Sequence, residues 1–201
     1  EGMEKLLDSG KIRAYGVCNF GVSDLKDWLK FGICASNQLP YSLLWRAIEF
    51  DMQELCEHQG IGILCYSSLM QGLLTGKFRN ADEVPEGRAR TRHFSGERPQ
   101  ARHGEPGCEA LTFQTIDALR EVSARTGHAM EALSLAWLAR QPGVTSVIVG
   151  ARDPSQLKAN VDAAAVALDH ETVAELSKIT DPLKQALGPN PDLWQGESRY
   201  R

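Results

Sequence analysis

The sequence has few of the features that would place it outside the ordinary globular proteins. It contains no run of about 18 apolar residues and no signal pattern at its beginning, so neither a membrane span nor secretion is predicted. Positive charge is not in excess, because 22 Lys and Arg residues face 26 Asp and Glu residues, which argues against a general nucleic-acid binder. These absences predict a soluble, cytoplasmic protein without a membrane or nucleic-acid partner.

Cysteine usage excludes a disulfide framework and gives no metal site. The five cysteines are an odd number and none is in C-x-x-C spacing, which fits buried thiols in a reducing compartment. With 201 residues, of which 42% are apolar and 24% charged, the chain is long enough for one sizeable core. We therefore expect one globular domain and predict no bound metal.

Apolar periodicity predicts strands and helices that alternate along the chain. Strands are predicted at residues 12–18, 35–39, 61–66 and 144–149, and helices at residues 23–31, 109–126, 130–140 and after Asp51, Pro154 and Asp169. Asp51 and Glu54 have capping-box spacing, and the tail at residues 181–201 is expected to be irregular. Alternation of this kind implies an α/β fold with a parallel sheet, and four strands are half of a (β/α)8 barrel, also called a TIM barrel.

The stretch VTSVIVGARDPSQLKAN, residues 144–160, has the pattern of a strand, a tight turn and a helix N-terminus. Asp153, Pro154 and Gln156 have the positions of an N-cap, a first helical residue and a capping-box partner. A helix N-terminus reached through Gly150, with Arg152 beside it, also suits a phosphate. The stretch thus allows either helix capping alone or phosphate binding.

A long polar segment, residues 79–108, separates the third predicted strand from the helix at 109–126. Loops of this length are uncommon in compact domains unless they close over a site or are disordered. The segment contains two histidines and five arginines spaced between Arg88 and Arg102. Two interpretations stay open, a solvated and partly mobile loop or a lid that closes over an anion.

Four motifs in this sequence resemble the aldo-keto reductase superfamily, in the bacterial branch related to potassium-channel β-subunits. The motifs are GKIRAYGVCNF (10–20), NQLPYSLLWRAIE (37–49), GIGILCYSSLMQGLLTGKF (60–78) and SVIVGARDPSQLKAN (146–160). They cover nearly the whole chain but match only the second half of that family's barrel, from its fifth strand onward. The resemblance implies that residues 1–201 are the carboxyl-terminal part of one barrel domain.

The resemblance implies an NADP(H) site at the ends of the predicted strands. Cys18, Asn19 and Gln38 match residues that hydrogen-bond the nicotinamide carboxamide, with Cys18 standing where the family usually has Ser, and Tyr66 matches the aromatic residue that stacks on the ring. The ribose and pyrophosphate segment is matched by Ser67, Ser68, Leu69, Gln71, Gly72 and Leu73. Without the resemblance, Asn19 is interpreted as a turn residue, Gln38 as a strand-end cap and Tyr66 as a half-buried aromatic.

At the other end of the cofactor, the resemblance assigns the residues 144–160 stretch to the adenosine. Gly150 permits close backbone approach, Arg152 pairs with the 2′-phosphate, and Gln156 and Asn160 face the adenosine one helical turn apart. An arginine at this position favours NADP(H) over NAD(H). Helix capping and phosphate binding, the two interpretations of this stretch, are compatible because one turn can do both.

The implied activity is the reduction of small aldehydes or ketones to alcohols by hydride transfer from NADPH. In the family, a Tyr acid with its Lys, His and Asp completes the reaction, and all four belong to the barrel's first half. No catalytic residue is therefore assigned in this chain, which is expected to need the amino-terminal half of the barrel. A half barrel exposes sheet edges, which favours pairing with another half or a homo-oligomer.

Two alternatives remain for the function. One is a non-catalytic subunit that binds or senses NADP(H), and the other is an independent doubly wound α/β domain that binds a phosphate ligand without redox chemistry.

Overall fold

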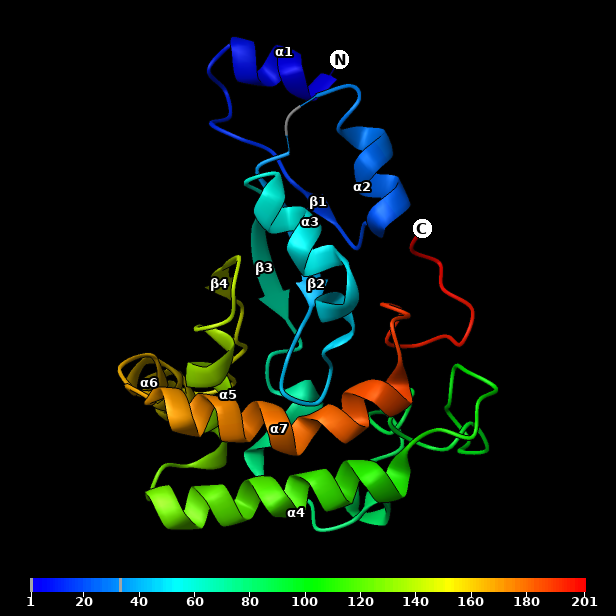
Figure 1. Ribbon diagram of the computed structural model, residues 1–201, viewed down its shortest axis with the longest axis vertical. Helices are drawn as coiled ribbons and strands as arrows, with labels where there is room; N and C mark the ends of the chain where they lie inside the picture. Colours follow the sequence, from blue (N-terminus) through cyan, green and yellow to red (C-terminus); the bar gives the residue numbers. More distant parts are fainter. Residues whose placement is uncertain (1, 33) are drawn as a thin grey trace.

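The centre of the molecule is a four-stranded parallel sheet (Figure 1). The computed structural model describes residues 2–32 and 34–201. Its strands are β1 (Val17–Cys18), β2 (Ser36–Pro40), β3 (Gly62–Tyr66) and β4 (Val144–Val147), in the spatial order β1-β2-β3-β4. Because each strand is parallel to the one before it in sequence, the sheet follows the wall of a (β/α)8 barrel for about half its course, which confirms the predicted fold class.

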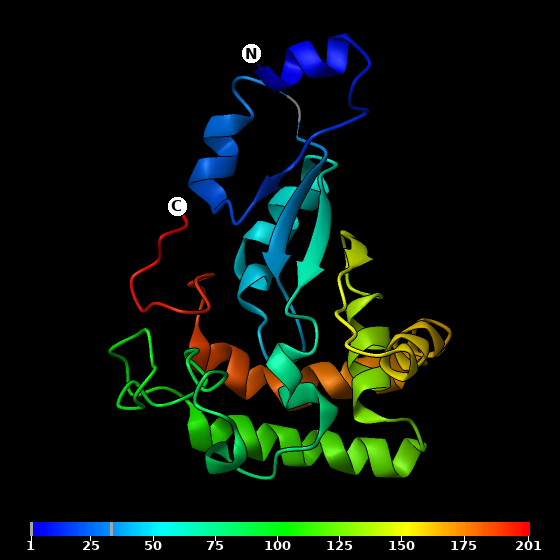
Figure 2. The ribbon, with the colours of Figure 1, turned by 180° about the vertical axis from the view of Figure 1, so that it is seen from behind.

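Helices surround the sheet, some beside it and some beyond its two ends (Figures 1 and 2). They are α1 (Gly2–Asp8), α2 (Val22–Trp28), α3 (Met52–His58), α4 (Glu109–Thr126), α5 (Met130–Leu138), α6 (Pro154–Ala164) and α7 (His170–Leu187), with short 3-10 helices η1 (Ala47–Phe50), η2 (Met70–Thr75) and η3 (Ala81–Glu83). Helix α3 packs on β3 and α5 on β4, while the two longest helices, α4 and α7, lie side by side. No helix among the described residues combines the length and apolar character that a membrane span requires.

The two faces of the sheet differ in burial. On β3, Ile63 and Cys65 are fully buried, whereas Gly62, Leu64 and Tyr66 on the alternate positions are only half buried. Side chains alternate between the faces of a strand, so one face of β3 packs under the helices and the other remains partly open. The open face is the one that would point toward the inside of a complete barrel wall.

Two strands are shorter than predicted. The predicted strand at residues 12–18 is confined to Val17–Cys18, although Ala35 N–H still donates to the Tyr15 carbonyl at 3.0 Å. Gly16 lies so close to β2 that an added Cβ would be 2.2 Å from Ser36 Oγ. This stretch has a partner strand on only one side, so the alternating pattern did not produce a full ladder. The predicted strand at 144–149 likewise ends at Val147.

Helix capping differs between α3 and the later helices. Asp51 precedes α3 but its side chain makes no capping hydrogen bond, so the predicted capping box with Glu54 is wrong. Asp51 follows directly on η1 and has a φ of −157° and ψ of −38°, a geometry that differs from that of a normal N-cap. By contrast, Asp153 and Asp169 accept hydrogen bonds from the first turns of α6 and α7.

The predicted irregular tail begins too early, because α7 continues through Pro182 to Leu187. A proline inside a helix removes one backbone hydrogen bond and favours a break. Here Leu183 and Leu187 are buried on the far side of the proline, with exposed fractions of 0% and 5%. Packing of this last part of α7 outweighs the local preference. The irregular segment is residues 188–201.

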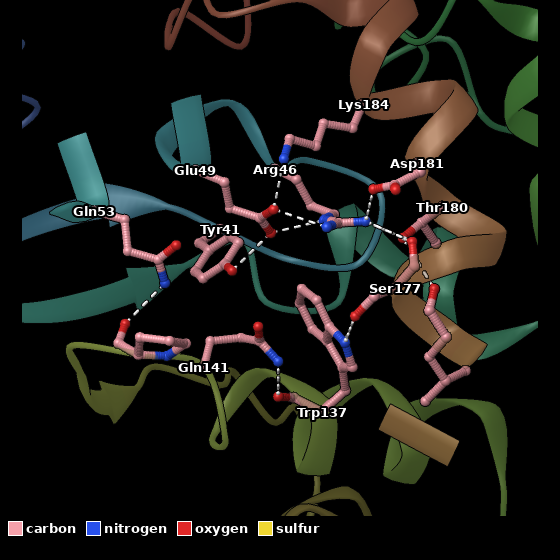
Figure 3. Close-up of polar contacts among 12 residues, drawn as sticks. Tyr41, Arg46, Glu49, Gln53, Trp137, Gln141, Ser177, Thr180, Asp181 and Lys184 are labelled. Atoms are coloured by element: carbon pink, nitrogen blue, oxygen red, sulfur yellow. Dashed lines mark hydrogen bonds and ion pairs between the residues drawn. The ribbon is translucent and has the colours of Figure 1, made fainter. Parts of the chain in front are cut away.

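An ion network that is buried at Arg46 and Glu49 and open at Asp181 holds α7 against the loop after β2 (Figure 3). Arg46 is only 7% exposed and forms a two-pronged pair with Glu49, with Nε–Oε1 at 2.6 Å and Nη2–Oε2 at 2.7 Å. Its Nη1 donates to the Ser177 carbonyl at 2.7 Å and pairs with Asp181 at 2.9 Å, and Lys184 pairs with Glu49 at 2.9 Å. We call Arg46, Glu49, Asp181 and Lys184 the Arg46 cluster.

The long segment at 79–108 is packed into the protein at its middle. Thr91 and His93 are fully buried and Phe94 is 1% exposed. His93 Nε2 lies 2.7 Å from the Leu44 carbonyl, and burial lowers the pKa of His93 to about 4, so the ring is neutral at pH 7. The interpretation as a solvated loop is therefore wrong for this middle part, because apolar and neutral side chains anchor it to the core. Closure over an anion stays a prediction.

Candidate functional site

A cavity of about 740 Å³ lies between the segment after β3 and the turn from β4 into α6. Nine of the residues predicted for the site line it: Ser67, Ser68, Leu69, Gln71, Gly72, Gly150, Arg152, Gln156 and Asn160. Its two walls are tied together, since Ser68 Oγ donates to the Ile148 carbonyl at 2.9 Å. Two segments about 80 residues apart in sequence, one following β3 and the other following β4, therefore form one site.

The first wall has an unusual backbone. Ser67, Met70 and Gln71 have positive φ values of 54°, 44° and 54°, and Gly72 has a φ of 95°. Left-handed conformations cost free energy for residues with a Cβ and persist where the surrounding structure determines them. Three such residues in a short stretch beside the 740 Å³ cavity give this segment a backbone of the kind found at ligand sites.

The second wall begins with a well-capped helix. Asp153 Oδ1 accepts the Gln156 N–H at 2.8 Å, and Gln156 Oε1 accepts the Arg152 N–H at 3.1 Å. A hydrogen bond to Ser155 and backbone bonds in the first turn lower the pKa of the Asp153 carboxyl, so it is charged at pH 7. Capping is thus present, and because a carboxylate already satisfies this helix end, its N–H groups alone do not make an anion site.

Three cations around the cavity supply the attraction for an anion. Lys77, Arg88 and Arg152 all line it, and a Cβ placed on Gly72 would lie 3.4 Å from Lys77 Nζ and 3.5 Å from Arg88 Nη1. Within residues 2–32 and 34–201, none of the three forms an ion pair with a carboxylate. Partial burial, then repulsion from Arg88 and Arg152, lowers the pKa of Lys77. We call these three residues the cavity cations.

Sequence reasoning missed two of the three cavity cations. The sequence predicts no role for Lys77, which lies in the GLLTGKF motif, or for Arg88, which is one of several arginines in the 79–108 segment. Glu131, also missed, is the only carboxylate among the described residues that line the cavity. Lys77 could have been proposed as a phosphate ligand, because it lies just after the segment that the resemblance matches to the ribose and pyrophosphate. Nothing local distinguishes Arg88 from the arginines around it.

The other predicted residues meet at the ends of β1, β2 and β3. Cys18 is in register with Gln38, and Tyr66 Oη donates to Asn19 Oδ1 at 2.9 Å. Asn19 has a φ of 58°, and its N–H donates to the Gln38 carbonyl at 2.9 Å. Burial raises the pKa of Tyr66, and the nearby Tyr200 raises it further, so its hydroxyl remains protonated and donates. The strand ends therefore bring the predicted polar residues together next to Ser67, which lines the cavity.

Not every predicted residue lies where the cofactor was expected. Leu73 is 3% exposed and packs in the hydrophobic core, so its side chain is not part of the cavity wall. Cys18 and Asn19 line a separate hollow of about 570 Å³ with Tyr200 and Arg201, and Gln38 and Tyr66 are among the lining residues of neither space. Within the described part of the chain, no group of three or more His, Cys, Asp or Glu residues could hold a metal ion.

Comparison with known proteins identifies the family of the chain. The model of the aldo/keto reductase family matches residues 1–181. The chain is 31% identical over 187 residues to the NADH-specific methylglyoxal reductase of Escherichia coli K12, covering 91% of this chain and 53% of that protein. It is 32% identical to protein tas of the same organism, covering 85% of this chain and 49% of that protein. The chain thus spans about half the length of the relatives it matches.

Solved structures agree with this result. The glycerol dehydrogenase AKR11B4 from Gluconobacter oxydans matches with a TM-score of 0.73 and 26% identity, over 94% of this chain and 54% of that chain. An aldo/keto reductase from Klebsiella pneumoniae, solved with NADP and acetate, matches with a TM-score of 0.63 and 26% identity, over 89% of this chain and 52% of that chain. Each of these structures extends well beyond the part that this chain matches.

Proposed function

This chain belongs to the aldo/keto reductase family, and from that premise we propose that it carries most of the NADP(H) site of an enzyme that reduces aldehydes or ketones. The observation that carries the proposal is the set of three cavity cations without carboxylate partners, on a cavity walled by left-handed backbone. Same-sign charges held near one another repel, and a polyanionic ligand would relieve that repulsion. A dinucleotide with a 2′-phosphate has this character.

The residues of this chain divide the cofactor between them. Arg152, on the adenosine side, would pair with the 2′-phosphate through its planar guanidinium. Lys77 and Arg88, on the opposite wall, would pair with the pyrophosphate, where Gly72 permits close approach. Asn19 keeps its side-chain N–H groups for the nicotinamide carboxamide, because only its oxygen accepts from Tyr66.

Bound NADPH would supply a hydride to the carbonyl carbon, and a proton on the carbonyl oxygen would complete the alcohol. This chain's part in that step is orientation: the Tyr66 ring offers a flat surface at the end of β3, and its hydroxyl is fixed by Asn19. The proton donor is expected from the family's first half, outside the part that this chain matches. No catalytic acid is therefore assigned, and the small carbonyl substrate is left at the level of its class.

The choice between NADPH and NADH is open to a direct test, since one relative is named as specific for NADH. Fluorescence titration of the full-length protein with each dinucleotide should show tighter binding of NADPH. Arg152→Ala should weaken NADPH binding by about 10- to 100-fold, the equivalent of one lost charged hydrogen-bonded pair, and leave NADH unchanged.

Lys158→Ala is the matched control, because Lys158 lies on α6, the helix that Arg152 precedes, but pairs with Asp162 at 2.7 Å outside the cavity. Equal NADPH dissociation constants for Arg152→Ala and the wild type would show that Arg152 does not hold the 2′-phosphate.

The two alternatives now differ in standing. An independent doubly wound domain is wrong, because the family model covers residues 1–181 and the strand order has no reversal. A non-catalytic sensing subunit makes its own prediction, binding of NADPH without oxidation when aldehydes or ketones are added. Absorbance of NADPH during incubation with such carbonyls separates this alternative from a reductase.

A further inference from the structure

The end of the irregular segment returns to the start of α2 and is fixed there (Figure 1). Arg201 N–H donates to Asp24 Oδ2 at 2.8 Å, Asp24 N–H donates to the Arg201 carbonyl at 2.8 Å, and Arg201 Nη2 pairs with Asp24 Oδ1 at 3.0 Å. Two hydrogen bonds that involve the backbone and one side-chain ion pair therefore join residues that are 177 positions apart in sequence.

A second anchor lies just before it. Asp192 is fully buried and accepts from Arg199 Nε at 2.6 Å and Arg199 Nη2 at 2.9 Å, as well as from the Trp194 N–H at 3.0 Å. Burial alone would raise the pKa of Asp192, but these hydrogen bonds outweigh it and lower the pKa, so the carboxylate is charged at pH 7. Between the two anchors, Tyr200 has a fixed backbone.

Gly21 shows that the loop after β1 is shaped to receive this segment. A Cβ added at Gly21 would lie 2.3 Å from the Arg201 carbonyl oxygen and 2.5 Å from its carbon. Gly21 has a φ of −78°, which any residue adopts, so the glycine is required for the close approach and not for its own conformation. Alanine here would push residues 199–201 away from the loop without straining the loop itself.

The side chain of Tyr200 reaches the nicotinamide end of the site. It lines the same hollow as Cys18 and Asn19, and its phenol group lies next to that of Tyr66, whose hydroxyl donates to Asn19 at 2.9 Å. The three side chains thus form a row, Tyr200–Tyr66–Asn19, that starts on the docked segment and ends on the carboxamide-binding candidate. Fixing Tyr200 therefore fixes the orientation of the other two.

We propose that Tyr200 is a positioning residue for the nicotinamide end of the cofactor, held in place by the docking of residues 199–201 on Gly21 and Asp24. The inference rests on the proposed function, since it concerns how Tyr66 and Asn19 meet the nicotinamide. Tyr200 acts through Tyr66, so its loss should affect ligands that contain the nicotinamide and spare ligands that fill only the adenosine end. A segment that served stability alone would not discriminate between such ligands.

The test compares NADPH with 2′,5′-ADP, which has the adenosine, the 2′-phosphate and one 5′-phosphate but no nicotinamide, in the full-length protein. Tyr200→Phe removes the hydroxyl that neighbours Tyr66 and should weaken NADPH binding by about 3- to 10-fold, with 2′,5′-ADP unchanged. Gly21→Ala should reproduce this selective loss by displacing the segment. Gly104→Ala is its matched control, because nothing lies within 4 Å of the added Cβ and the backbone is not left-handed.

Three results overturn the inference. One is unchanged NADPH binding in Tyr200→Phe, and another is an equal loss for NADPH and 2′,5′-ADP, which would indicate a general effect on structure. The third is a wild-type protein that binds neither NADPH nor NADH, which would remove the proposed function together with the inference. The first two leave the proposed function intact, so the failures are distinguishable.

Discussion

Arg46 and Arg152 lie in charged clusters that differ in almost every physical respect. Arg46 is 7% exposed and its cluster contains two cations and two carboxylates, each within 2.9 Å of a partner (Figure 3). The cavity cations Lys77, Arg88 and Arg152 lie on an open wall, and their mutual repulsion contributes to the lowered pKa of Lys77. Every cation of the first cluster has a carboxylate partner, whereas none of the three cavity cations forms an ion pair among the described residues.

This difference assigns different work to the two clusters. A closed and neutral network fixes one arrangement of α7 against the loop after β2, and losing one partner leaves a buried charge. An open group of like charges contributes little to stability and attracts an anion from solution. Composition alone does not separate them, because both are built from the same residue types. The presence or absence of partners does.

The largest expected effect is the loss of folding stability when the Arg46 cluster is broken. Arg46→Met should lower the free energy of unfolding by about 3–5 kcal/mol, because Glu49 would lose its two-pronged partner while 11% exposed. Urea denaturation measures this change. Arg13→Met, an exposed arginine, should shift stability by about 0.5 kcal/mol or less. A loss below about 1 kcal/mol in Arg46→Met would contradict the structural role of the cluster.

The matching substitutions in the cavity cations should leave the stability of the fold unchanged and weaken NADPH binding. Lys77→Ala combined with Arg88→Ala should weaken NADPH binding by about 100-fold, with urea midpoints equal to wild type. Because these side chains are accessible, NADPH binding to wild type should also weaken as salt rises. Calorimetric titration at two salt concentrations measures both effects. Unfolding of the double variant would contradict the comparison.

A smaller effect is the pH dependence of the stability that the Arg46 cluster contributes through Glu49. Burial tends to raise the pKa of Glu49, but hydrogen bonds from Arg46 and Lys184 outweigh it and hold the pKa below its usual value. The unfolded chain therefore takes up a proton first as pH falls, and the stability due to Glu49 is present above about pH 4.3 and lost below it. Urea denaturation from pH 7 to pH 3 should show wild type losing its advantage over Glu49→Gln. A constant difference would contradict this account.

The smallest effect concerns the helix cap beside the cavity. Asp153→Ala should lower the melting temperature by about 2–4 °C, since the Gln156 N–H loses its acceptor, while Asp153→Asn should keep the cap. Asn also removes a negative charge next to Arg152, so NADPH binding should strengthen by about 2- to 3-fold in this variant. Thermal melts and titrations of the pair check both signs. Weaker binding in Asp153→Asn would show that the carboxylate orients Arg152 instead.

The sequence predicted the order of the fold and part of the site for physical reasons that can be named. Periodicity located the helix at 109–126 to the residue, since its apolar stripe and Gly127 at a φ of 72° are local signals. It failed at Pro182, where packing of Leu183 overrides the proline. Ladder formation at residues 12–16 depends on a neighbouring strand, which no local pattern reports.

For the site, the local sequence pattern predicts the second wall of the cavity but not the residues that approach it from elsewhere in the chain. The turn at Gly150 and Arg152 has a recognisable strand-to-helix chemistry, and the family resemblance supplied Asn19, Gln38 and Tyr66. Arg88 and the Arg46 cluster depend on long-range approach, since Arg46 meets Ser177 across 131 positions in sequence. Charge pairing is decided by the fold, so sequence could not separate a buried, paired arginine from a free one.

The most direct test of the cavity cations as a phosphate site is the ratio of dissociation constants for 5′-AMP and 2′,5′-ADP in the full-length protein. These ligands differ by one phosphate and contain no nicotinamide. We predict that 2′,5′-ADP binds at least about 10-fold more tightly, and that Arg152→Ala abolishes the preference while Lys158→Ala keeps it. Equal affinity of the wild-type protein for the two nucleotides would contradict the account.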